Sequence, residues 1–176
     1  QFRCPDFVPQ VCQALKQSGA PANRLVLELT ESLVLHDVAD TVAKMQALRR
    51  HGVRFALDDF GTGYSSLAHL RHLPLHQLKI DRSFVQDIVT EPGDAAIVQT
   101  IIGMARNLGL SVIAEGVETP AQRHALQRLD CTVFQGFLFA RPQPLSAFEA
   151  WLAQRPTPIS FFATAISAPL NPREFS

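Results

Sequence analysis

The sequence contains few of the residues that mark secreted, membrane-spanning or polyanion-binding proteins. Only three of its 176 residues are cysteines, Cys4, Cys12 and Cys131, and no two form a CxxC pair. This odd, scattered set predicts free thiols in a reducing compartment rather than a disulfide framework or a zinc site. No apolar run approaches the ~20 residues of a membrane span, and the first residues lack a signal-peptide pattern. We therefore expect a soluble, cytoplasmic domain without membrane contact.

The chain also lacks an excess of either charge. Lys+Arg and Asp+Glu both number 16, so the formal net charge is zero. Proteins that bind nucleic-acid polymers usually carry a basic excess, and such a partner is not expected here. A small phosphorylated ligand held through metal is compatible with this balance. With 47% hydrophobic and 18% charged residues, the chain can build one sizeable core, typical of a single domain.

The most informative stretch is 55–67, which reads FALDDFGTGYSSL. An apolar run ends in the adjacent acids Asp58 and Asp59, and a turn containing Gly61 and Gly63 follows. This pattern predicts a buried strand that delivers two carboxylates to its C-terminal end. Since successive strand side chains point to opposite faces, the second acid must lie where the strand is already turning. The glycines either permit a tight turn or mark a mobile active-site loop.

Strands and helices alternate along the chain. Strands are predicted at 25–30, 54–60, 78–81, 111–117 and 132–139, with helices between them. Local helix signals agree, because Gly19 and Asp37 read as caps and Thr119–Gln122 as a capping box. Alternation of this kind predicts a parallel sheet covered by helices.

Each predicted strand carries a polar group in its C-terminal half: Glu28, Asp58 with Asp59, Lys79, Glu115 and Gln135. Five consecutive strands that bring polar groups to one rim favour a barrel over an open sheet. A (β/α)₈ barrel typically needs about 250 residues, so we expect about five C-terminal βα units of one. The pattern supports a domain over residues 1–155 and a tail over residues 156–176.

Four of these strand-end groups are acids, namely Glu28, Asp58, Asp59 and Glu115. Gathered at one rim they would repel each other, and divalent cations relieve such repulsion. An all-carboxylate set without histidine suits Mg²⁺ or Mn²⁺ better than zinc. Two cations about 3.5–4 Å apart would use a bridging acid beside a second acid, which adjacent aspartates can supply.

Lys79 is the cation of the set and allows three interpretations. It could hold a metal-bound hydroxide or stabilise charge developing on phosphate, form a Schiff base, or make a structural ion pair. A Schiff-base lysine requires an apolar pocket rather than four acids. Glu31 and Glu118 are either surface acids or members of the site, and Gln135-Gly136 could form a bulge.

Five segments of the sequence, taken together, match the motifs of a known protein family. LELTES, ALDDFGTGYSSL, LKIDRSFV, SVIAEGVET and QGFLFARP occur in this order, and they closely resemble the EAL family of bacterial phosphodiesterases. That family hydrolyses the second messenger cyclic di-GMP to linear pGpG. The resemblance covers residues 1 to about 155 and implies a modified TIM barrel, a homodimer through the EAL domain, and an upstream sensor or cyclase-like domain.

The resemblance also implies roles for individual residues. Glu28 resembles a ligand of the first metal, and Asp58 a ligand that bridges two metals. Asp59 and Glu115 resemble second-metal ligands, and Lys79 the residue that orients the attacking water. Lys79, Glu115 and Asp59 are thereby the catalytic candidates, with two Mg²⁺ or Mn²⁺ ions as cofactors.

Further positions follow from the same resemblance. Glu31 resembles the acid that anchors an active-site loop, and Glu118, Gln135 and Gly136 resemble supporting residues of the substrate pocket. The loop residues are Phe60, Gly61, Thr62, Gly63, Tyr64, Ser65 and Ser66.

The resemblance departs at the front of the chain. Gln1-Phe2 is similar to the end of the family's NVSxxQF stretch, whose Asn is a metal ligand, and the Glu-x-Leu motif with a further ligand lies earlier still. We therefore expect weak activity from the 176 residues alone. Two alternatives stay open: a non-catalytic EAL module that binds cyclic di-GMP or a protein, and a different barrel enzyme such as a lysine aldolase or a metal-dependent lyase.

Overall fold

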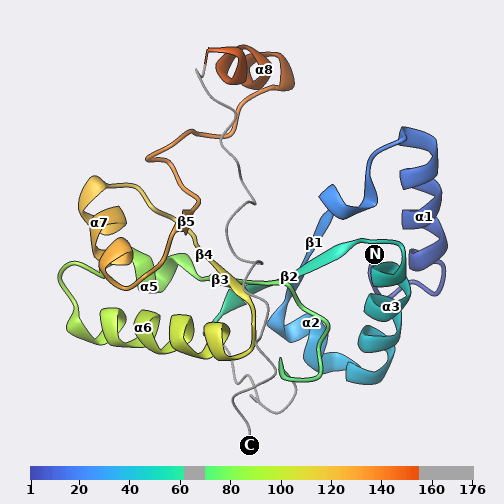
Figure 1. Cartoon of the computed structure of the whole chain (residues 1–176), viewed down its shortest axis with the longest axis horizontal. Coiled ribbons are helices and arrows are strands. Elements are labelled where there is room, and N and C mark those ends of the chain that lie inside the picture. The colour runs from blue at the N-terminus through green and yellow to red at the C-terminus, as the bar shows by residue number, and fades with distance from the viewer. Residues whose placement is uncertain (62–69, 155–176) are drawn as a thin grey trace, which may run out of the picture. The chain divides into compact units, whose positions relative to one another are not determined.

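Five parallel strands form one sheet in the computed structural model, which describes residues 1–61 and 70–154. The strands are β1 (Val26–Thr30), β2 (Arg54–Phe60), β3 (Gln77–Ile80), β4 (Ser111–Ala114) and β5 (Val133–Phe134). Their order in the sheet equals their order in the chain (Figure 1). Sequential parallel strands are typical of a barrel, whereas a doubly wound sheet reverses its order at a switch point. The predicted architecture of about five βα units is confirmed.

Helices connect the strands and cover the sheet. They are α1 (Phe7–Ser18), the 3-10 turn η1 (Ala22–Arg24), α2 (Glu31–His36), α3 (Val38–Arg50), α5 (Arg82–Gln86), α6 (Pro92–Asn107) and α7 (Pro120–Arg128). The helix α8 (Leu145–Ala153) follows the last strand and belongs to a separate unit of the chain. Figure 1 shows α1, α2 and α3 beside β1 and β2, and α5, α6 and α7 beside the later strands. Among the described residues, no helix has the length and apolar content that crossing a membrane requires.

The local capping signals are confirmed. Gly19 ends α1 in the left-handed conformation with φ 65°, and the Asp37 side chain accepts the Asp40 N–H at the start of α3. Thr119 and Gln122 form a reciprocal capping box before α7. These features depend on a few neighbouring residues, so they could be predicted without the fold.

The core lies between the sheet and the helices, and β3 is its most buried strand. All four β3 residues are buried, including the polar Gln77 and Lys79 beside Leu78 and Ile80. The Lys79 side chain is 3% exposed, so water can hydrate its charge very little. Its charge must therefore be met by partners inside the protein.

Several predicted boundaries are wrong. β4 ends at Ala114 and β5 has two residues, because Gly116 leaves the ladder with φ 67° and the chain after β5 turns back on itself. The short helices α2 and α5 were not predicted. α5 begins where the Asp81 carboxylate accepts the N–H of Ser83 at 2.9 Å, a local capping signal that the apolar pattern alone does not reveal.

The chain divides into two compact units, residues 1–140 and 141–176. In the second unit the structure describes α8, on which the rings of Phe148 and Trp151 stack at 5.8 Å. The predicted tail, 156–176, lies outside the described residues. The boundary after residue 155 therefore stays a prediction.

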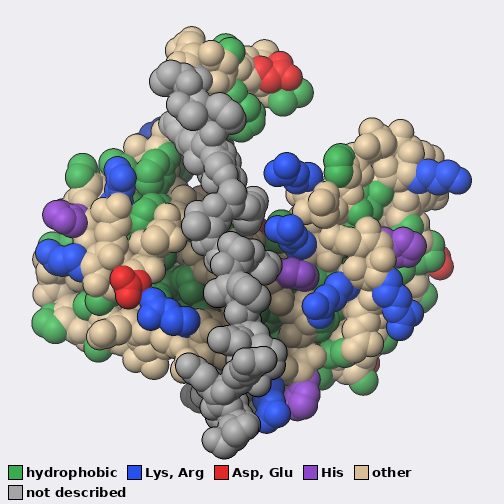
Figure 2. All heavy atoms as spheres, viewed as in Figure 1, with side chains coloured by type: hydrophobic (Ala, Val, Ile, Leu, Met, Phe, Trp, Pro, Cys, Tyr) green, Lys and Arg blue, Asp and Glu red, His purple; other side chains and the backbone are tan. Residues whose placement is uncertain are grey.

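Charged side chains are unevenly spread over the first unit. No Asp or Glu occurs from residue 41 to residue 57, a segment that contains Lys44, Arg49, Arg50 and Arg54. This segment includes most of α3 and the start of β2. In Figure 2 the lysine, arginine and histidine side chains gather over this part of the visible face, with little acidic surface among them.

The three cysteines are free, as predicted.

Candidate metal and phosphodiester site

The two adjacent acids at the end of β2 reach the same rim because the strand distorts there. The pairing of β2 with β3 shifts register between Leu57 and Phe60, and Asp59 takes a left-handed φ of 53°. This conformation costs a non-glycine residue on the order of 1 kcal/mol, and aspartate tolerates it better than most residues. The prediction that the second acid lies where the strand turns is confirmed.

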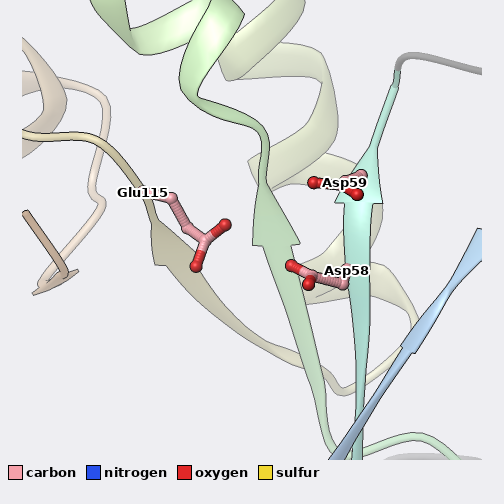
Figure 3. Close-up of side chains that lie close together, drawn as sticks. All are labelled: Asp58, Asp59 and Glu115. Atoms are coloured by element: carbon pink, nitrogen blue, oxygen red, sulfur yellow. The ribbon is translucent and has the colours of Figure 1, made fainter.

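The third acid of the cluster comes from the segment after β4. Glu115 follows Ala114 directly, and in Figure 3 its carboxylate points across β3 toward Asp58. Asp58, Asp59 and Glu115 each offer an oxygen, and these three oxygens all lie within 4.8 Å of one another. Residues far apart in the sequence thus form one carboxylate cluster at the carboxyl ends of the strands.

Lys79 lies beside this cluster and is almost completely buried, with 3% of its side chain exposed. Its ammonium nitrogen lies 2.6 Å from Glu28, 2.7 Å from Glu115 and 3.0 Å from Asp58. Burial alone would lower the pKa of Lys79, but hydrogen bonds to Glu115, Glu28 and Asp58 outweigh it and raise the pKa. The lysine is therefore held in its charged form and neutralises part of the acidic cluster.

Two carboxyl groups of the cluster are less acidic than usual. Burial raises the pKa of Glu115, Lys79 lowers it, and the charges of Asp58 and Glu28 raise it again. Burial likewise raises the pKa of Asp59, and its acidic neighbours Asp58 and Asp81 add to the effect. Concentrated negative charge thus persists here despite Lys79.

Asp81 is the residue that sequence reasoning missed at this rim. Burial would raise its pKa, but hydrogen bonds from the Ser83 hydroxyl and backbone N–H lower it overall, and its carboxyl also interacts with that of Asp59. The signal was available, because Asp81 follows β3 directly and lies two positions after Lys79. Its capping role in α5 makes it both a structural group and a neighbour of the cluster.

The arrangement fits a divalent cation. Asp58 Oδ1 is buried, and the contact that it makes among the described residues is with the Lys79 ammonium at 3.0 Å. An exclusively carboxylate donor set matches the hard cations Mg²⁺ and Mn²⁺. Glu28 stands outside the group of three and joins it through Lys79.

Glu31 is the first residue of α2 and is 7% exposed. Neither of its carboxylate oxygens meets a hydrogen-bond donor among residues 1–61 and 70–154. The amino end of a helix favours a carboxylate, but a buried one needs further partners. Its role as a loop anchor stays a prediction.

The predicted loop itself is only partly described. Phe60 is the last residue of β2 and is buried, so it belongs to the strand rather than to a loop. Gly61 has φ 101°, and a Cβ there would lie 2.8 Å from the Phe84 ring, which explains the requirement for glycine. Thr62, Gly63, Tyr64, Ser65 and Ser66 lie outside the described residues.

The remaining candidates line the segments after β4 and β5. Glu118 is exposed and lies 3.5 Å from Arg82. The Gln135 carbonyl accepts the Val117 N–H at 3.0 Å. A Cβ at Gly136 would collide with the backbone of Val117, so this glycine permits the close approach of the two segments. The structure thus brings these residues to the same end of the sheet as the carboxylate cluster.

Fold and site together define a class: a barrel-type α/β domain with acids and one buried lysine at the carboxyl ends of its strands. The model of the EAL domain family matches residues 1–142, and the chain belongs to this family. The cyclic di-GMP phosphodiesterase NbdA of Pseudomonas aeruginosa is 50% identical over 141 residues, which cover 80% of this chain and 18% of NbdA.

Solved structures agree. The EAL domain of Mycobacterium smegmatis DcpA superposes with a TM-score of 0.83 at 42% identity, covering 90% of this chain and 71% of that one. Complexes of Klebsiella pneumoniae BlrP1 with cyclic di-GMP and calcium or manganese give a TM-score of 0.75 at 35% identity, covering 80% and 36%. The chain spans about a fifth of the length of the curated relatives that it matches.

Proposed function

We propose that this domain hydrolyses cyclic di-GMP to linear pGpG. The observation that carries the proposal is the cluster of Asp58, Asp59 and Glu115 against buried Lys79, in a chain of the EAL family. In the reaction, the water oxygen bonds to one phosphorus, the bond from phosphorus to the ribose 3′-oxygen breaks, and a proton from the water ends on that 3′-oxygen, which leaves as a hydroxyl group. The relatives named for this substrate support its choice.

The carboxylates would hold two divalent cations, Mg²⁺ or Mn²⁺. Asp59 and Glu115 would hold the second cation, Glu28 would hold the first, and Asp58 would serve as a ligand of both. Such cations, when bound, act as Lewis acids and lower the pKa of water. The known calcium and manganese complexes of BlrP1 support divalent cations at this site.

Lys79 has a distinct task in this proposal. Its charge is fixed by three carboxylates, so it can offset negative charge that develops on the phosphate. When these carboxylates hold cations, an N–H that they release would orient the water. Because the amine is held protonated, it is a poor nucleophile for a Schiff base. This charge state argues against the lysine-aldolase alternative.

The surroundings of the domain are also proposals. The chain covers about a fifth of its relatives, which supports additional sensor or cyclase-like domains upstream. The free cysteines support a cytoplasmic location, and the family supports a homodimer. Light scattering on the full-length protein would test the dimer.

The alternative function is a module that binds cyclic di-GMP or a protein without turnover. The front-end ligands implied by the resemblance fall outside residues 1–176, and we propose weak activity for these residues alone. The intact set of Asp58, Asp59, Lys79 and Glu115 argues for hydrolysis in the full-length protein.

The test is hydrolysis of cyclic di-GMP with Mn²⁺ or Mg²⁺, with pGpG resolved by chromatography. Full-length protein should form pGpG and lose this activity in EDTA, and residues 1–176 should form much less. If the protein binds cyclic di-GMP tightly but forms no pGpG with either Mn²⁺ or Mg²⁺, the domain is a binding module instead. Metal-independent turnover would contradict the site proposed here.

A further inference from the structure

Glu115 and Glu118 both lie on the segment 115–119, between β4 and α7, which has no regular secondary structure. A segment without regular secondary structure keeps a defined conformation only where hydrogen bonds and packing from other residues fix it. The question is therefore which side chains of this chain fix the segment.

The Gln122 side chain makes two hydrogen bonds to this segment. This side chain is buried, with the residue 8% exposed. Its Oε1 accepts the N–H of Glu118 at 2.8 Å and the N–H of Thr119 at 2.9 Å. Only the Thr119 bond belongs to the capping box, so the bond to Glu118 serves another purpose. It fixes the backbone of a candidate pocket residue.

The other half of the same amide reaches a different element. Gln122 Nε2 donates to the carbonyl oxygen of Gln86 at 3.0 Å, and Gln86 is the last residue of α5. α5 begins after Asp81, at the end of the strand that carries Lys79. One buried amide thus joins the segment of Glu115 and Glu118 to the element that follows Lys79.

The first residue of α5 contacts the same segment. Arg82 forms a 3.5 Å ion pair with Glu118. Its side chain passes over Gly116, where an added Cβ would collide with it. Gly116 also has φ 67°, so it serves both the turn and the passage of Arg82. Both ends of α5 therefore help to hold the segment. Arg82, at the start of α5, contacts it directly, and Gln86, at the end of α5, is joined to it through the Gln122 side chain.

We propose that Gln122 is a positioning residue for substrate binding: it holds Glu118, and the segment that carries Glu115, in the arrangement that the substrate meets. This inference rests on the proposed function. Gln122 touches neither substrate nor metal in this assignment and acts only through the segment. Loss of the Gln122 amide should therefore weaken substrate binding more than it lowers the rate of the chemical step.

The test compares Gln122→Met with Gln127→Met in the full-length protein. Methionine matches glutamine in length but lacks the amide, and Gln127 is an exposed glutamine on the same helix. We expect Gln122→Met to raise KM with Mn²⁺, and the cyclic di-GMP Kd with Ca²⁺, about tenfold, as the loss of the partner of two part-buried N–H groups implies. The kcat should fall less than KM rises, and Gln127→Met should match the wild type.

Conservative replacements sharpen the outcome. Gln122→Glu keeps an oxygen acceptor for Glu118 and Thr119 but loses the donor to Gln86, so its KM should lie between wild type and Gln122→Met. Should Gln122→Met fail to fold, Arg82→Gln decides, because Arg82 is exposed: a raised KM with kcat kept supports the proposal. An unchanged KM in folded Gln122→Met, or in Arg82→Gln when that variant decides, overturns it. A wild type that neither binds nor hydrolyses overturns the proposed function first.

Discussion

The two ends of the same sheet carry opposite charge. At the carboxyl ends lie Glu28, Asp58, Asp59, Asp81 and Glu115, whereas the amino ends are bordered by Arg24, Arg49, Arg50, Arg54 and His76. A net charge of zero conceals this division. The ligand site of a parallel barrel lies at the carboxyl ends of its strands, which is the acidic end of this sheet.

The ends also differ in how their buried groups are satisfied. At the amino end His76 accepts the Phe55 N–H through Nδ1 at 3.3 Å, and its own backbone N–H donates to the Phe55 carbonyl at 2.9 Å. At the carboxyl end both buried oxygens of Glu31 lack a hydrogen-bond donor among the described residues, and Asp58 Oδ1 meets the Lys79 ammonium at 3.0 Å. Unsatisfied buried oxygens reduce stability, which a structural end would avoid and a ligand site exploits.

The largest effect is expected for Asp58→Asn. The amide removes one negative charge of the carboxylate cluster. Mutation of residues that only support metal ligands typically lowers metal affinity or activity 10–100-fold, and loss of a ligand itself should cost more. We expect pGpG formation to fall more than about 100-fold. Asp87→Asn, at the exposed end of α5, is the matched control and should keep full activity. Equal activity in both variants would contradict the site.

The next effect concerns Lys79→Met in metal-free protein. Removing one partner of a buried ion pair costs about 3 kcal/mol because the other charges stay uncompensated. Denaturation in EDTA should show a loss of this order, and added Mn²⁺ should recover part of it. Lys16→Met, on an exposed position of α1, should leave the curve unchanged. A metal-free Lys79→Met variant as stable as wild type would show that the carboxylates need no cation.

A smaller effect is expected for Gly136→Ala. The new methyl group would meet the Val117 backbone, which cannot move aside as a flexible side chain would. We expect a loss of about 2 kcal/mol, in the range measured for overpacked sites. Gly103→Ala is the control, because nothing lies within 4 Å of a Cβ there and alanine favours the helix by up to about 1 kcal/mol. In chemical denaturation the unfolding midpoint should thus fall for Gly136→Ala and rise for Gly103→Ala.

The smallest effect belongs to the basic end. Burial lowers the pKa of His76, and the charges of Arg49 and Arg54 lower it further. The folded protein therefore binds this proton less readily than the unfolded chain. The stabilising contribution is present above pH 6.5, the ordinary pKa, and is lost as the pH falls through the lower folded value.

His76→Gln tests this prediction, because its amide oxygen can accept the Phe55 N–H without titrating. Unfolding midpoints between pH 7 and pH 5 should depend less on pH in the variant than in wild type. His124→Gln, on the exposed face of α7, is the control. Identical pH profiles for wild type and His76→Gln would show that this histidine does not contribute.

Parts of the site could be predicted because their signals are local. Asp58 and Asp59 end an apolar strand and are followed by Gly61, and this short pattern defines their position on a rim. The capping box of Thr119 and Gln122 also spans four residues. By contrast, the 132–139 segment looked like a strand from its apolar pattern, but only Val133 and Phe134 pair. Its end is decided by contact with Val117, which no local pattern contains.

The sequence by itself determined the alternation of strands and helices, the cap residues and the placement of an acid or lysine at successive strand ends. Only the tertiary structure decided which of these groups meet. Lys79 pairs with Glu28, Asp58 and Glu115 because β3 lies between β2 and β4, and Gln122 reaches both Glu118 and Gln86 because α7 packs there. Hydrogen bonds and ion pairs act over a few ångströms in space, whatever the separation along the chain, so the fold must bring the partners together first.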